Sequence, residues 1–178
     1  ADNKWTSFGQ LELIETQTYS SSVAYVEFTN LGDYNVHFLT YQDVMPDTNN
    51  IRVLQLQFIE NGTLETGSVY EYGQQYSYIG GSAELKSTAD TEIELSYEIG
   101  NTTPCSANGY CYMYNLTDST KYSFTTNHTV RGNTTTFTGA IFGSGVLPQA
   151  SAVNGFRLKT SSGNFSSFDF SLYGIRYS

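Results

Sequence analysis

The chain has 178 residues, of which 39% are hydrophobic, and this is enough for one domain with a substantial core. Its formal net charge is −9 and its eight Lys and Arg residues are scattered singly, which argues against binding to nucleic acids or anionic membranes. Charged residues make up only 14% of the chain, and no apolar run is long enough to cross a bilayer. We therefore expect a single domain over residues 1–178, with a surface built mainly from uncharged polar residues.

The first half of the chain alternates apolar and polar residues, as half-buried β-strands do. This pattern predicts strands over residues 11–13, 22–29, 36–42 and 51–59. The third of these is nearly apolar throughout, which predicts a central position in a sheet. A loop is expected over residues 45–50, and a hairpin turn over residues 60–63.

The second half of the chain continues the same alternation. It predicts strands over residues 67–78, 91–99, 109–116, 121–130 and 134–142, the last ended by Gly143-Ser-Gly145. The strand over 91–99 should have one wet, acidic face. Two final strands within residues 153–177 should form a hairpin through Ser161-Ser-Gly-Asn164, because Gly163-Asn164 suits a tight reversal.

The spacing of these elements predicts the fold class. Short strands separated by Gly, Asn and Ser turns, with almost no helix, are typical of sandwiches and barrels. We expect an all-β fold, a jelly-roll-like antiparallel β-sandwich of about 8–10 strands. No change in composition and no linker divides the chain, so one domain is the simplest interpretation.

Two cysteines, Cys105 and Cys111, flank the sequence Ser-Ala-Asn-Gly-Tyr. A hairpin that turned at Asn108-Gly109 would place them opposite each other, within reach of a disulfide. The alternative is a pair of free thiols. A zinc site is not expected, because the sequence offers too few further ligands nearby.

Three stretches of the chain resemble a known family. They are the strands and Ser-rich turn over residues 13–38, the loop and strand over residues 45–63, and the end from Ser161-Ser-Gly-Asn-Phe165 to Leu172-Tyr-Gly-Ile175. Together they resemble a β-sandwich module of bacteriophage virion proteins that closes with an S-G-N-F…LYGI hairpin. The resemblance covers the two ends of the chain, and residues 80–148 match only in strand spacing.

The resemblance implies a jelly-roll-like sandwich on a virion, in a capsid-decoration, head-fibre or tail-fibre protein. The module begins near residue 1, without a long attachment region, which favours a cement protein that binds the outer capsid surface and stabilises the head. The expected partners are the major capsid protein and copies of the chain itself in a homotrimer, with no nucleic acid, membrane or cofactor. The start of the chain has no signal-peptide core, which favours synthesis in the host cytoplasm. The matching motifs are core and turn positions, so no catalytic residue is implied.

Tyrosines are the best candidates for an interface or a ligand site. They form two groups, Tyr70, Tyr72, Tyr76 and Tyr78 in one and Tyr110, Tyr112 and Tyr114 in the other. Alternation puts the second group on one face of a strand. Tyr is enriched at protein interfaces, and exposed rings can also stack on sugars. We favour subunit contact, and the alternative is a carbohydrate-binding receptor-recognition module of a tail or head fibre that binds host surface glycans.

Residues for catalysis or metal binding lack the spacing that those functions need. The sequence has no Gly-x-Ser-x-Gly motif, and His37 and His128 are isolated. Two further alternatives are a glycan hydrolase using Glu92, Glu94 or Glu98, and a calcium site using Asp43, Asp47, Asn49 and Asn50. Solvated carboxylates and local turns are the simpler interpretations. The chain is therefore expected to be non-enzymatic and free of bound metal.

Overall fold

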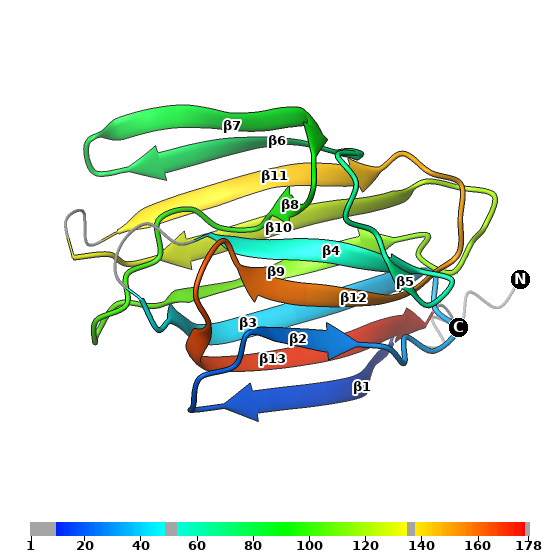
Figure 1. Ribbon diagram of the computed structural model, residues 1–178, viewed down its shortest axis with the longest axis horizontal. Helices are drawn as coiled ribbons and strands as arrows, with labels where there is room; N and C mark the ends of the chain where they lie inside the picture. Colours follow the sequence, from blue (N-terminus) through cyan, green and yellow to red (C-terminus); the bar gives the residue numbers. More distant parts are fainter. Residues whose placement is uncertain (1–9, 49–52, 135–137, 177–178) are drawn as a thin grey trace, which may run out of the picture.

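Two antiparallel β-sheets pack face to face in the computed structural model, which describes residues 10–48, 53–134 and 138–176 (Figure 1). The larger sheet has eight strands in the order β1 (Gln10–Tyr19), β13 (Phe165–Arg176), β3 (Val36–Pro46), β9 (Ala107–Tyr114), β10 (Ser123–Arg131), β11 (Gly139–Leu147), β6 (Tyr70–Tyr78) and β7 (Gly81–Asp90). The smaller sheet has five: β2 (Tyr25–Phe28), β12 (Val153–Thr160), β4 (Leu54–Glu60) and β5 (Thr63–Leu64), with β8 (Ile93–Glu94) paired to β4. The predicted all-β antiparallel sandwich is confirmed, with no helix among the described residues.

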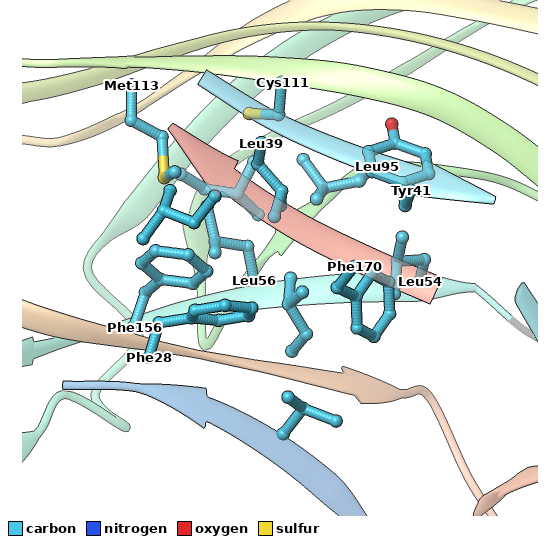
Figure 2. Close-up of a cluster of buried hydrophobic side chains, with 14 of the residues drawn as sticks. Phe28, Leu39, Tyr41, Leu54, Leu56, Leu95, Cys111, Met113, Phe156 and Phe170 are labelled. Atoms are coloured by element: carbon cyan, nitrogen blue, oxygen red, sulfur yellow. The ribbon is translucent and has the colours of Figure 1, made fainter. Parts of the chain in front are cut away.

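The core lies between the sheets and is built from the alternate residues that each strand turns inward. Phe28 and Phe156 stack in the smaller sheet, with ring centroids 5.0 Å apart. Leu39, Cys111 and Phe170 of the larger sheet belong to the same buried cluster (Figure 2). Burial of these side chains is the main stabilising contribution, because full burial of one Leu or Phe is worth roughly 1.5–3 kcal/mol.

The smaller sheet covers only part of the larger one. In Figure 1 it overlies β3, β9 and β13, whereas β6 and β7 extend beyond it. Residues 91–99 lie over the inner face of β10 and β11. Ile93 and Leu95 are fully buried there, and the Leu95 carbonyl accepts hydrogen bonds from Asn127 Nδ2 at 3.2 Å and Thr129 Oγ1 at 2.5 Å.

The predicted closing hairpin is wrong in its pairing. β12 pairs with β2 and β4 in the smaller sheet, whereas β13 pairs with β1 and β3 in the larger one. The turn at residues 161–164, with Gly163 at φ 74°, therefore carries the chain from one sheet to the other. The prediction failed because two strands with one apolar face each fit opposite layers of a sandwich as well as they fit a hairpin.

The predicted strand over residues 91–99 is also wrong, since only Ile93–Glu94 forms a strand. Its acidic residues do not form a wet face. Glu92 Oε2 lies 3.4 Å from Lys159 Nζ. Glu98 Oε2 lies 3.1 Å from Arg131 Nη2, and the Arg131 side chain is fully buried. The acidic residues are held by partners from strands distant in sequence, which alternation does not show.

Two glycines that were expected to end a strand lie inside β11. A Cβ atom at Gly143 would be 2.6 Å from Gln74 Cγ, and one at Gly145 would be 2.7 Å from Ile93 Cγ2. Glycine is needed here for close packing on neighbouring elements, and the strand continues through both positions. Among the thirteen described strands, β7 and the two-residue β5 have no counterpart among the predicted ones.

Of the two alternatives for Cys105 and Cys111, the structure has the free thiols and not the disulfide. Asn108-Gly109 is not a turn. It lies within the continuous strand β9, in which residues 107 and 111 are about 13 Å apart at roughly 3.3 Å per residue. Cys105 lies before the first residue of β9, and Cys111 is fully buried within the strand.

Candidate functional site

The larger sheet has one face in the core and one face that points away from the smaller sheet. Along β10 the two sets alternate strictly: Ser123, Thr125, Asn127, Thr129 and Arg131 are buried, and Phe124, Thr126, His128 and Val130 are exposed. We call the side that bears the exposed residues the outer face. Most of the exposed aromatic side chains described below lie on it.

The pairing register aligns the outer-face residues in rows that cross the sheet. The middle row contains Leu13, Tyr173, Phe38, Tyr112, Thr126, Ser144, Gly73 and Lys86, from β1 to β7. One flanking row contains Leu11, Ile175, Val36, Tyr114, Phe124, Val146 and Glu71. The other contains Thr16, Ser171, Thr40, Tyr110, His128, Phe142, Gln75 and Glu84. In these three rows, charged residues occur only in β6 and β7.

One end of this face is apolar. We define the apolar half as Leu11, Leu13, Val36, Phe38, Tyr112, Tyr114, Tyr173 and Ile175. Its rings form a continuous cluster, because Phe38 lies 4.6 Å from Tyr112 and 6.2 Å from Tyr173 between ring centroids. Leu11 and Leu13 are 56% and 60% exposed. A contiguous exposed apolar patch of this kind typically marks an interaction surface.

The outer face is hollowed from β9 to β7, beginning at Tyr112 and Tyr114 of the apolar half. Three hollows of about 540, 380 and 790 Å³ follow one another from β9 to β7. The first and second share Phe142 and Gly143, and the second and third share Gly73 and Lys86. We call this series of hollows the groove. Because neighbouring hollows share residues, the groove is one feature that crosses five strands.

Gly73 keeps the groove open. It lies on the outer face in the row between Ser144 and Lys86. A Cβ atom placed on Gly73 would have no heavy atom within 4 Å, so the position has room for a side chain and carries none. Gly73 is therefore not required by packing, in contrast to Gly143 and Gly145.

The second tyrosine group lies where the alternation predicts. Tyr110, Tyr112 and Tyr114 share the outer face, and all three line the first hollow. Tyr110 is 39% exposed, and its ring meets His128 edge-on at 5.9 Å and Tyr112 at 5.9 Å. These residues are accessible to a partner.

The first tyrosine group lies on the inner face, so Tyr70 and Tyr76 were wrong predictions for a ligand surface. Tyr70 is fully buried, and its hydroxyl accepts a hydrogen bond from the Phe58 backbone N–H at 2.8 Å. Tyr76 is 4% exposed, and its hydroxyl accepts a hydrogen bond from Arg131 Nη2. Tyr72 and Tyr78 are half-buried on the same face. The sequence pattern did not show that this group lies on the inner face.

Sequence reasoning missed several residues of the outer face. Phe38, Phe124, Phe142, His128 and Tyr173 join the tyrosines through strand pairing. Each of them alternates in step with the exposed residues of its own strand. This alternation is the sequence feature that could have indicated an outward orientation. Without the strand order, that signal cannot assemble them into one surface.

The two histidines considered for catalysis do not come together, whereas Glu92 and Glu94 lie close enough for their charges to interact. His37 lies fully buried on the inner face, where its Nε2 is 2.9 Å from the Leu31 carbonyl and burial lowers the pKa of its imidazole, whereas His128 is on the outer face. Burial, followed by the charges of Asp90 and Glu92, raises the pKa of Glu94 to about 7. Glu94 is therefore a poorly solvated carboxylate within the fold, and it serves as a probe of stability.

The loop considered for calcium is tied to a neighbouring turn. Asp47 Oδ1 accepts a hydrogen bond from the Asn164 backbone N–H at 3.0 Å, and Asp47 Oδ2 accepts one from Ser22 Oγ at 3.2 Å. Asn49 and Asn50 lie outside the described residues. Among the residues that the structure describes, no three His, Cys, Asp or Glu side chains are grouped so as to hold a metal ion.

Comparison with known proteins gives no relative, since no protein-family model matches the chain and no curated protein matches it either. Across the described ranges, the structure has no helix that is long and apolar enough to span a membrane. The outer face is therefore the feature from which function has to be argued.

Proposed function

We propose that this chain is a non-enzymatic bacteriophage structural protein that decorates the outer surface of the capsid, with the apolar half of the outer face as its attachment surface. The observation that carries the proposal is the pair of apolar rows from β1 to β9, in which Leu11 and Leu13 are exposed and the other six residues are half-buried. The phage setting comes from the sequence resemblance. The partners in this proposal are the major capsid protein and other copies of the chain.

The apolar half suits protein contact for an energetic reason. Full burial of a Leu side chain is worth about 1.5–3 kcal/mol. Leu11 and Leu13 are more than half exposed, so covering each would contribute about 1–1.5 kcal/mol. The aromatic rings of Phe38, Tyr112 and Tyr173 would add to this, since large aromatic residues dominate interface energetics.

The charge distribution favours the same half. None of its eight residues is charged, so little electrostatic solvation would be lost when a partner covers it. Attachment to a capsid also repeats the contact over a lattice. Copies that contact one another while bound would hold each other in place, so a modest affinity at each site suffices.

A binding experiment with particles that lack the chain tests the proposal. Purified protein is added to these particles and the bound fraction is measured by co-sedimentation. The double variant Leu11→Asn, Leu13→Asn should bind at least tenfold more weakly, because it loses the apolar area that attachment covers. Val130→Asn is the matched control, since Val130 is 48% exposed on the same face but outside the apolar half.

Two results would contradict the proposal. One is equal binding by the double variant and the control. The other is equal resistance to heat and osmotic shock by particles with and without the chain, because a cement protein must strengthen the shell to which it binds.

A further inference from the structure

We infer that the groove binds a neutral oligosaccharide that lies across β9, β10, β11, β6 and β7. This inference goes beyond capsid attachment and concerns the other end of the outer face. It rests on the hollows, on the aromatic and polar groups that line them, and on their charge.

The groove offers aromatic surfaces that are open to solvent. Phe142 is 53% exposed and stands between the first two hollows, and Phe124 is 44% exposed at the third. Tyr110 and His128, whose rings meet edge-on with centroids 5.9 Å apart, also line the first hollow, and His128 is the cross-strand neighbour of Phe142. The apolar C–H face of a sugar ring packs well on such rings, and the Tyr hydroxyl can bond to the hydroxyls of the sugar.

Polar side chains accompany the aromatic ones along the whole groove. Thr126 lines the first hollow, Gln75 and Glu84 line the second, and Ser144 lines the third. Hydroxyl, amide and carboxylate groups together provide both hydrogen-bond donors and acceptors. They can therefore pair with sugar hydroxyls, which both donate and accept. A concave site with an apolar lining and a few polar groups is the usual form of a small-molecule site.

The length of the groove favours a chain of sugars over a single sugar. Adjacent strands lie about 4.8 Å apart, so the four spacings from β9 to β7 give a span of about 19 Å. The ligand would run across the strands, along the rows that the register defines. The three hollows would then act as successive subsites.

Charge selects a neutral ligand. Glu71 and Glu84 line the groove with a single Lys86, which is 3.0 Å from Glu84, and the whole chain has a formal charge of −9. An acidic polysaccharide would be repelled. Single-stranded nucleic acids also stack on aromatic rings, but their binding needs a positively charged groove.

Two variants test the groove without disturbing the core. Gly73→Gln puts a side chain into open space on the groove floor, and Phe142→Ser removes an exposed ring. Ser82→Gln and Val130→Ser are matched controls, because both positions are exposed on the outer face and neither lines a hollow described above. Thermal unfolding of all four variants checks that each is folded.

The assay measures binding of the whole chain to laminarihexaose, mannohexaose and chitohexaose, with hexagalacturonate as the acidic probe. We expect at least one neutral probe to bind, with affinity reduced at least tenfold by Gly73→Gln and by Phe142→Ser and changed less than twofold by the controls. The inference is overturned by absence of binding to all three neutral probes at millimolar concentration, by stronger binding of the acidic probe, or by binding that both groove variants leave intact. None of these results would bear on capsid attachment, which is tested with variants at the opposite end of the face.

Discussion

Glu94 makes the stability of this protein depend on pH in a direction opposite to that of most carboxylates. Its side chain is half-buried in β8, and burial raises its pKa from the ordinary 4.5 to about 7. Between these two pH values the folded state keeps a proton that the unfolded chain has released. The free energy of unfolding therefore falls as pH rises from 4.5 to 7, because the carboxylate must ionise in a poorly solvated position.

The magnitude follows from the same two pKa values. One pKa unit corresponds to about 1.4 kcal/mol, so a rise from 4.5 to about 7 would lower the free energy of unfolding by about 3 kcal/mol for a fully buried group. Glu94 is only partly buried, and solvent screening reduces the expected effect to about 1–2 kcal/mol. Replacement by Gln keeps the shape and removes the titration, so Glu94→Gln should be more stable than the parent by about 1–2 kcal/mol at pH 8 and nearly equal at pH 4.5.

Urea unfolding at both pH values, followed by intrinsic fluorescence, measures this difference. Glu84→Gln is the control, since the Glu84 side chain is 67% exposed and its replacement should change stability little at either pH. The reasoning is refuted if Glu94→Gln stabilises the protein equally at both pH values, or if it destabilises the protein at pH 8.

Three further predictions concern other buried positions. Gly145→Ala should lower the free energy of unfolding by about 1–3 kcal/mol, because its Cβ would lie 2.7 Å from Ile93 Cγ2, and an unchanged urea midpoint would contradict this. Burial lowers the pKa of His37, so in the Glu94→Gln background stability should fall as pH drops below 6.5, and His37→Gln should flatten this pH dependence of the urea midpoint. A thiol reagent should modify Cys105 but not buried Cys111 in the folded protein. After unfolding without reductant it should modify both cysteines. Fewer than two reactive thiols in the unfolded protein would indicate a disulfide.

The fold class was predictable because most strands bury one face. Residues 123–131 show this, since their alternation survives as the buried and exposed positions of β10. β7 escaped prediction because nearly all of it is exposed on both faces, so burial imposes no strong alternation on its sequence. Pairing between strands was not predictable either, as the separation of β12 and β13 into two sheets shows.

The candidate site was predictable only in part, for the same reason. The phase of Tyr110, Tyr112 and Tyr114 is local to one strand, so the sequence contains it. Phe38 and Tyr173 lie far from them in the sequence and become neighbours only because β9, β3 and β13 are adjacent in the larger sheet. Which face points outward depends on the position of the smaller sheet, and that depends on the whole core.

The most direct test of the proposed attachment is an image of the assembled virion by electron cryomicroscopy, at a resolution that allows the sandwich to be fitted. The account predicts that the apolar half of the outer face, around Leu13, Phe38 and Tyr173, lies against the capsid shell. Density that places this half toward solvent, or that places the chain away from the shell, would contradict it.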